Sequence, residues 1–183
     1  IVTHGGDPDY SMVTRSSDGQ LMFLANLISK MKQHTALGSR IASVHNGSSL
    51  FTGDAGQGES NFRRWIIEND WLEAIVALPL KMFYNTGIAT YVWVISNRKE
   101  ERRKGKVQLS DATSGFTPLR KNLGEKGVEI SDADADRVLA TYKAFDQADD
   151  PDHSKVFDGI DFGYSKITVE RPLRIAGVEA DRI

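Results

Sequence analysis

The sequence of 183 residues contains no cysteine, which excludes both a disulfide framework and a thiolate metal site. Its four histidines lie far apart, without the short spacings of metal ligands, so we expect no metal site. No apolar run approaches the roughly 20 residues of a membrane span, and the first residues do not resemble a signal peptide. We therefore expect a cytoplasmic protein with no membrane segment.

The chain also lacks an excess of positive charge, because 23 basic residues stand against 25 acidic ones and the net charge is -2. Nucleic-acid binding would need a local basic face or a partner subunit that supplies the positive field. One basic stretch, RKEERRKGK at 98–106, has a solvated turn as its default interpretation. The alternative is that Arg102, Arg103 and Lys104 contact DNA phosphates, which such side chains bind without reading sequence.

Hydrophobic periodicity predicts the main elements. Apolar residues recur at helical spacing after Gln20, and short apolar runs at 41–44, 72–79 and 89–96 have the length of strands. A helix is expected between the first two strands, which makes a right-handed parallel crossover unit. The connection at 79–88 is too short for another crossover helix, so the third strand should run antiparallel to the second.

These elements predict an α/β fold whose mostly parallel sheet ends in an antiparallel hairpin and is covered by helices on both faces. This arrangement is typical of the class I, Rossmann-like methyltransferases. We expect an edge strand at 106–112 and end the first domain, 1–112, there. The remainder, 113–183, is expected to be a helical and extended C-terminal extension, whose helix begins at Ser131 with Asp134 in a capping box.

The connection between the two hairpin strands, LPLKMFYNTGIA, displays adjacent aromatic side chains, Phe83 and Tyr84, followed by Asn85 and Thr86. In this fold, ligands bind beyond the carboxyl ends of the parallel strands, where this connection leaves the sheet. The alternative is that the two aromatic side chains pack under the sheet edge. His45 and Asn46 end the strand at 41–44, so they belong to the same edge, where a role in the active site and a role in a turn fit equally.

Long ordered segments of the chain resemble one family. The stretch from Gly38 to Lys99, GSRIASVHNGSSLFTGDAGQGESNFRRWIIENDWLEAIVALPLKMFYNTGIATYVWVISNRK, closely resembles the methylation subunit of type I restriction-modification systems. The resemblance continues upstream through SSDGQLMFLANLISKMK and downstream through GKVQLSDAT, LRKNLG and FGYSKITVERPLR. It therefore spans nearly the whole chain.

The resemblance implies transfer of a methyl group from S-adenosylmethionine to the exocyclic amino group of adenine in DNA. Such an enzyme must extrude the base from the duplex and hold it in a pocket with aromatic faces. Phe83 or Tyr84 would stack on the flipped adenine, while Asn85 and Thr86 would bond its edge or the adjacent backbone. The implied partners are DNA, the specificity subunit, the restriction subunit and a second methylation subunit.

The sequence departs from the family pattern in two motifs. It contains neither the Asn-Pro-Pro-Phe or Asn-Pro-Pro-Tyr motif that binds the target amino group nor the glycine-rich motif that binds S-adenosylmethionine. The chain also begins with Ile1 rather than Met, so we expect a carboxyl-terminal fragment with no catalytic residue of its own that is inactive alone. The alternative is a non-enzymatic module for subunit assembly or DNA interaction.

The last segment, FGYSKITVERPLRI, alternates apolar and polar residues and is too short for a core of its own. Alternation over such a stretch predicts an extended arm with one buried face. We expect this arm to dock on another part of the assembly, either the amino-terminal region of the methylation subunit or the specificity subunit.

Overall fold

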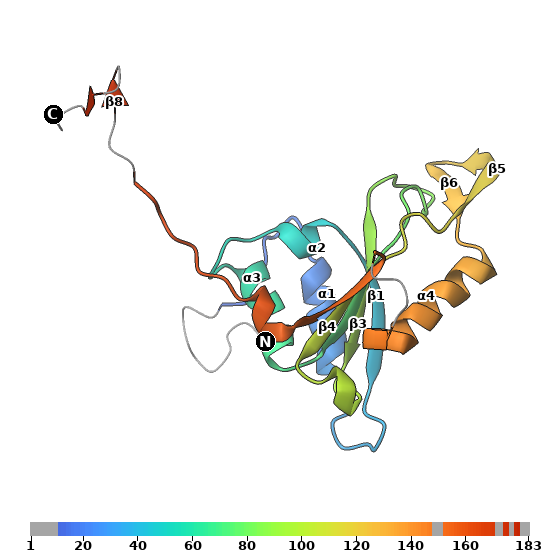
Figure 1. Ribbon diagram of the computed structural model, residues 1–183, viewed down its shortest axis with the longest axis horizontal. Helices are drawn as coiled ribbons and strands as arrows, with labels where there is room; N and C mark the ends of the chain where they lie inside the picture. Colours follow the sequence, from blue (N-terminus) through green and yellow to red (C-terminus); the bar gives the residue numbers. More distant parts are fainter. Residues whose placement is uncertain (1–10, 148–151, 171–173, 176–177, 180–183) are drawn as a thin grey trace.

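A five-stranded sheet in the order β1-β3-β2-β4-β7 forms the centre of the computed structural model (Figure 1), which describes residues 11–147, 152–170, 174–175 and 178–179. The strands are β1 (Arg40–Asn46), β2 (Leu72–Ala77), β3 (Thr90–Ser96), β4 (Lys106–Asp111) and β7 (Ser154–Asp158). The mixed α/β architecture and the antiparallel β2–β3 hairpin predicted from the sequence are confirmed.

The predicted mostly parallel sheet is wrong. Strands β1 and β2 do run in the same direction, but β3 inserts between them and pairs antiparallel with both. The only parallel pairing in this sheet joins β2 to β4, and β7 pairs antiparallel with β4. The predicted edge strand β4 is therefore interior, since β7, whose sequence is polar and follows an acidic loop, forms the edge.

Three helices cover one face of the sheet, α1 (Gln20–Ser29), α2 (Ser48–Phe51) and α3 (Gly58–Glu68). The apolar stripe of α1 and the side chains of Phe62 and Ile66 on α3 pack against Trp93 and Ile95 of β3 and are almost completely buried. This cluster is the main core of the described residues, and hydrophobic burial there holds α1 and α3 on the sheet.

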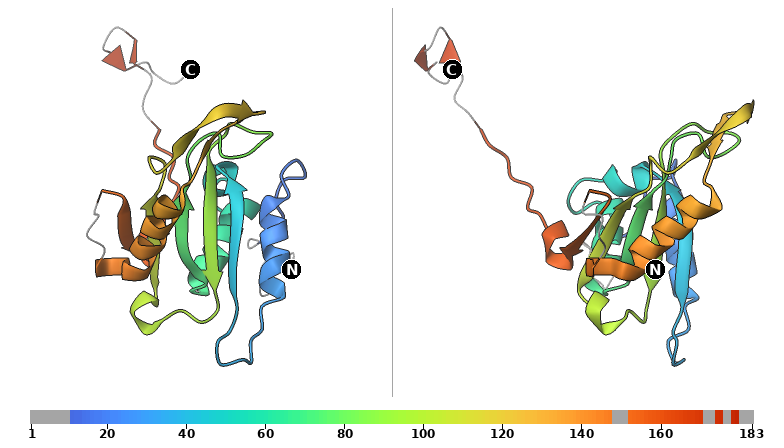
Figure 2. Two further views of the ribbon diagram at one scale, coloured as in Figure 1. Left: turned by 90° about the vertical axis from the view of Figure 1, so that its right-hand side faces the viewer. Right: turned by 45° about the vertical axis from the view of Figure 1, so that its right-hand side comes forward.

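The opposite face is covered by α4 (Asp132–Ala144), as the two views of Figure 2 show. Its N-cap is Ser131, whose Oγ accepts a hydrogen bond from the backbone N–H of Asp134 at 3.2 Å, as predicted; the Asp134 carboxylate accepts from the Ser131 hydroxyl, so the second bond of the predicted capping box is not formed. No residue of α4 is fully buried, so this face depends on polar contacts more than on an apolar stripe. Two short 3₁₀ turns, η2 (Glu101–Arg103) and η3 (Phe145–Gln147), lie at its lower end.

A separate hairpin, β5 (Thr117–Leu123) and β6 (Lys126–Glu129), follows β4 and projects beside the β2–β3 connection (Figure 2). After β7 come a 3₁₀ turn, η4 (Gly159–Phe162), and extended chain that leaves the body of the molecule (Figure 1). Two short strands, β8 (Arg174–Ile175) and β9 (Val178–Glu179), pair with each other.

The boundary predicted after residue 112 stays a prediction. Strand β7 belongs to the second predicted region and nevertheless completes the sheet of the first. Helix α4, also from the second region, covers that sheet. The two regions therefore share one sheet.

Candidate functional site

The carboxyl ends of β1, β2 and β4 meet at one edge of the sheet, because β1 and β2 both run antiparallel to β3 and β2 runs parallel to β4. This is the edge at which ligands of open α/β sheets bind. It carries the β2–β3 connection at 78–89, which we call the aromatic loop. Asn46 is opposite Thr90, the first residue of β3 after that loop, so the predicted residues His45 and Asn46 do lie at the same edge.

Within the aromatic loop, the side chains of Phe83 and Tyr84 are not buried. Phe83 is 36% exposed and Tyr84 58% exposed, whereas Pro79 at the start of the loop is fully buried. An antiparallel bridge between Phe83 and Thr86 closes a tight turn that displays Tyr84 and the exposed Asn85 at its tip. The four predicted base-contacting residues are thus together, on one turn open to solvent.

The β5–β6 hairpin holds this turn from the side. The backbone N–H of Glu125 donates to the carbonyl oxygen of Tyr84 at 2.8 Å, and that of Gly127 donates to the carbonyl oxygen of Lys81 at 3.0 Å. The ammonium of Lys126 lies 5.3 Å from the centroid of the Tyr84 ring, within the range of a cation–π contact. Lys81 has a φ of 58°, an uncommon conformation for a residue with a side chain, and the hairpin bond helps to maintain it.

Close contact between hairpin and loop depends on Gly124. Its φ is 66°, and a Cβ at this position would stand 2.5 Å from the carbonyl oxygen of Tyr84. A side chain there would therefore push the two segments apart. This support was missed by the sequence analysis, in which only the sequence NLGEKG, a turn composition, could have indicated a hairpin.

A polar cluster of four side chains lies at the end of β1 beside the N-terminus of α1. The Gln20 amide Nε2 donates to Asp18, to the Asn46 Oδ1 at 2.8 Å and to the Ser48 Oγ at 2.6 Å. The Ser48 hydroxyl donates to the Asp18 carboxylate, and chiefly this bond lowers the pKa of Asp18 to about 2. Sequence reasoning found Asn46 but missed the other three, of which Asp18 and Gln20 come from a distant part of the chain and Ser48 lies two residues after Asn46.

His45 points to the other side from Asn46, into the core. Its ring is 5% exposed and meets the Trp93 ring edge-on, with the centroids 5.7 Å apart. Burial lowers the pKa of His45, against the opposing influence of Asp18, so the neutral imidazole is favoured. Of the two residues predicted at this edge, only Asn46 faces the polar cluster.

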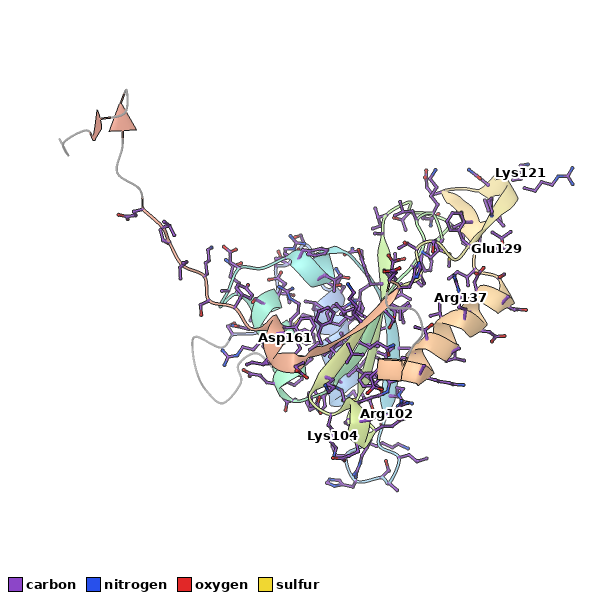
Figure 3. The ribbon with its side chains drawn as sticks, in the orientation of Figure 1. Arg102, Lys104, Lys121, Glu129, Arg137 and Asp161 are labelled. Atoms are coloured by element: carbon purple, nitrogen blue, oxygen red, sulfur yellow. The ribbon has the colours of Figure 1, made fainter. Side chains whose placement is uncertain are left out.

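The predicted phosphate contacts lie at the opposite edge of the sheet, between the end of β3 and the start of β4 (Figure 3). Arg103 is buried there with 2% of its surface exposed, and its guanidinium contacts Glu73 at 3.6 Å and lies over the rings of Tyr142 and Phe145. Arg102 pairs with Glu100 and Lys104 with Glu101. The structure therefore does not bring these three residues to the aromatic loop, and only Arg102 and Lys104 remain accessible.

A cavity of about 1100 Å³ opens between α3 and the strands β2, β4 and β7. Its walls are largely apolar, with Leu72, Ile75, Leu109 and Phe157 among them, and none of the four turn residues of the aromatic loop lines it. Burial lowers the pKa of Arg63, which also lines this cavity. The cavity is therefore separate from the exposed turn.

The N-terminus of α3, though not the exposed glycine-rich turn at 54–57 before it, is covered by an earlier part of the chain. A Cβ on Gly58 would stand 1.8 Å from the carbonyl oxygen of Val13, and the Asn61 amide donates to the Ser11 carbonyl oxygen at 2.9 Å.

Among the described residues there is no group of three metal-ligating side chains, and no helix of that part of the chain could cross a membrane.

The family and the relatives that match this chain are methylases. A family model described as N-6 DNA Methylase matches residues 6–171. The chain is 29% identical, over 119 residues, to the MjaIX methylase subunit of a type I restriction enzyme from Methanocaldococcus jannaschii, covering 65% of this chain and 20% of that protein. The MjaVIII methylase subunit of the same organism is 28% identical over 140 residues, covering 75% of this chain and 23% of that protein.

Among solved structures, the type I restriction-modification system methyltransferase subunit from Streptococcus thermophilus is similar, with a TM-score of 0.68 at 22% identity. The match covers 84% of this chain and 30% of that one. The fold is therefore that of such methyltransferase subunits. This agrees with the fold class predicted from the sequence, that of the Rossmann-like methyltransferases. The chain spans about a fifth of the length of the two curated relatives.

Proposed function

The chain belongs to the N-6 DNA Methylase family, and we propose that it is part of a type I restriction-modification DNA methyltransferase that methylates the exocyclic amino group of adenine. Within that enzyme, the described residues receive the target base. The supporting observation is the exposed turn of the aromatic loop at the carboxyl edge of the sheet, where Phe83 and Tyr84 stand next to Asn85 and Thr86.

The turn has the chemistry that a flipped adenine requires. A base taken out of the stack loses its neighbours on both faces, and stacking on an aromatic side chain replaces one of them at about 1–3 kcal/mol per base. An amide can accept from the adenine amino group and donate to a ring nitrogen, which suits Asn85. Lys126 already lies over the Tyr84 ring, so the base would use the Phe83 ring or the remaining face of Tyr84.

The polar cluster at the end of β1 supports the same edge. Asn46 and Gln20 hold each other in place by two hydrogen bonds, from Gln20 Nε2 to Asn46 Oδ1 and from the Asn46 backbone N–H to Gln20 Oε1 at 3.1 Å. Ordered amides and a carboxylate with a low pKa beside the aromatic loop would form the polar wall of a base pocket. The phosphate contacts proposed for Arg102 and Lys104 belong to the far edge and would serve another stretch of DNA or a partner.

S-adenosylmethionine is the methyl donor that the family implies, but the described residues do not fit it. A cofactor of this type is bound where a glycine-rich turn opens a helix, and at α3 the first helical residue, Gly58, is closed off by the carbonyl oxygen of Val13. In the proposed enzyme, the role of the described residues is therefore to bind the DNA. Their proposed role in catalysis is to hold the base.

The proposed macromolecular partners are DNA, the specificity subunit, the restriction subunit and a second methylation subunit. The net charge of -2 fits an enzyme whose DNA affinity is shared with other subunits. The extended segment after η4 leaves Ile167 and Val169 exposed at 76% and 70%, and such side chains suit an arm that docks on a neighbour. Pro172 and Leu173, which the predicted arm also includes, lie outside the described residues.

The test uses the full-length methylation subunit assembled with its specificity subunit. Phe83→Ala and Tyr84→Ala are assayed with labelled S-adenosylmethionine and unmethylated DNA, and Phe23→Ala, which removes a ring that is 75% exposed on α1, is the control. At least one of the two loop variants should lose about one to two decades of methylation rate at unchanged melting temperature.

Normal methylation by both loop variants would show that the aromatic loop does not hold the base. If methylation is retained and only subunit assembly is lost, the alternative of a non-enzymatic assembly module is correct for this part of the chain.

A further inference from the structure

The β5–β6 hairpin has no core of its own. Every residue of β5 except Leu119 is exposed, and a two-stranded hairpin alone is at best marginally stable in water. Its position is instead set by the aromatic loop, through the bonds from Glu125 to Tyr84 and from Gly127 to Lys81. Hairpin and loop thus form one surface at the edge that receives the base.

This surface carries basic side chains that have no acidic partner. Lys81 on the loop and Arg120 and Lys121 on β5 are exposed, and in the described part of the chain no ion pair joins any of them to a carboxylate. Figure 3 shows Lys121 pointing away from the body of the molecule. Two acidic residues of the hairpin, Glu125 and Glu129, are also exposed, so the surface is basic by a modest margin.

The basic stretch at 98–106 is less available to a phosphate than the hairpin is. Between β3 and β4, Arg103 is buried, Arg102 is engaged by Glu100 and by two backbone carbonyls of α4, and Lys104 pairs with Glu101. A phosphate that bound there would have to displace these contacts. On β5 of the hairpin, Arg120 and Lys121 have no such ion pair to lose among the described residues.

The dimensions also match a nucleic-acid strand. Lys121 lies three positions before Gly124, which touches the aromatic loop, and at about 3.3 Å per residue this is about 10 Å. Successive nucleotides of one strand are about 3.4 Å apart along the axis of a duplex, so the hairpin extends about three base steps from the loop.

We propose that the β5–β6 hairpin, with Arg120, Lys121 and Lys126, together with Lys81 of the loop, binds the phosphate backbone of the DNA strand beside the flipped base. This inference rests on the proposed function and names a backbone-binding surface for it. The hairpin positions DNA on one side of the aromatic loop while its backbone bonds hold the loop in shape. Contacts of this kind fix the register of DNA and read no sequence.

The experiment measures DNA affinity against salt concentration with the assembled full-length enzyme. The test variant is Arg120→Gln/Lys121→Gln, whose two side chains form no ion pair within the described part of the chain. The control variant is Lys30→Gln/Lys32→Gln, which removes the same charge from exposed positions beyond α1. Because each phosphate contact contributes about 0.9 to the slope of log affinity against log salt, the test variant should lose about 1.8 from that slope.

The loss should be the same on cognate and unrelated DNA, and the control should keep the wild-type slope. An unchanged slope in the test variant overturns the proposal. If the variant also loses the specificity subunit, the hairpin is instead a protein interface. Failure of the base pocket is a separate result, because Phe83→Ala and Tyr84→Ala act on the methylation rate and remove no charge.

Discussion

Arg103 and its two neighbours show how position decides the role of a residue. In the sequence, Arg102, Arg103 and Lys104 are three equivalent basic residues in a polar stretch. In the structure, Arg103 is enclosed by Glu73, Gln108 and the rings of Tyr142 and Phe145, whereas Lys104 is exposed. Glu73 is completely buried, so Arg103 and the half-exposed Arg40 together balance its charge.

We therefore predict that Arg103→Met is strongly destabilising. The change leaves the Glu73 carboxylate buried with one partner fewer and removes the contact that holds the end of α4 to the sheet, at a cost of about 3–5 kcal/mol in the free energy of unfolding. Lys104→Met, which breaks only an exposed pair, should cost less than about 1 kcal/mol. Urea unfolding measures the free energy of unfolding of both variants. Equal decreases for the two would show that the buried ion pair of Arg103 does not stabilise the fold.

At the scale of elements, the β5–β6 hairpin and the aromatic loop depend on each other. The loop is 12 residues from Leu78 to Ala89 with no regular structure of its own apart from the bridge at its tip. The hairpin has backbone pairing but little buried surface. Each supplies the donors or acceptors that the other lacks, and Gly124 allows the approach.

Replacing Gly124 with Ala should uncouple the two elements. A matched control is Gly105→Ala, because Gly105 has a similar φ of 69° but nothing within 4 Å of its would-be Cβ. Both substitutions should cost about 1–2 kcal/mol for the left-handed backbone. Only Gly124→Ala should also lower the methylation rate of the full-length enzyme, by about one decade, since it disturbs one or two loop hydrogen bonds.

The specific readout for Gly124→Ala is the fluorescence of 2-aminopurine placed at the target adenine, which reports whether the base is flipped. Equal fluorescence and equal rates for the two glycine variants would mean that the hairpin does not position the loop.

At the scale of the whole molecule, the extended arm is the part that buries least. It leaves the body after η4, contributes Tyr164 to the rim of the cavity and makes an exposed ion pair between Lys166 and Asp54 at 2.7 Å. The apolar side chains of Ile167 and Val169, which the sequence predicted to face a partner, contribute little to the stability of the described fold.

We predict that Ile167→Ser/Val169→Ser in the full-length subunit leaves its melting temperature within about 1 °C of wild type, because almost no buried surface is lost. Co-purification with the specificity subunit or with a second methylation subunit should fall several-fold, because the arm would lose its apolar contact. Leu37→Ser, at a loop position that is 92% exposed, is the control for exposed apolar side chains. Unchanged assembly of the double variant would make the arm dispensable.

Much of the local structure could be predicted from the sequence. The stripe after Gln20 predicted α1, the apolar runs predicted β1, β2 and β3, and Ser131 with Asp134 predicted the start of α4. The short connection at 79–88 predicted the antiparallel β2–β3 pairing. Periodicity and capping act within one element, so neighbouring residues are sufficient to determine them. Family membership was predictable for a related reason, since it rests on long ordered matches along the chain.

Only the tertiary structure decided which elements are neighbours. The insertion of β3 between β1 and β2, and the addition of polar β7 outside β4, depend on pairing between segments that are far apart in sequence. The burial of Arg103, the meeting of Asp18 with Ser48 and the support of Tyr84 by the hairpin depend on it as well. These contacts are long-range, and their free energy comes from desolvation and from hydrogen-bond geometry, which residue type alone does not specify.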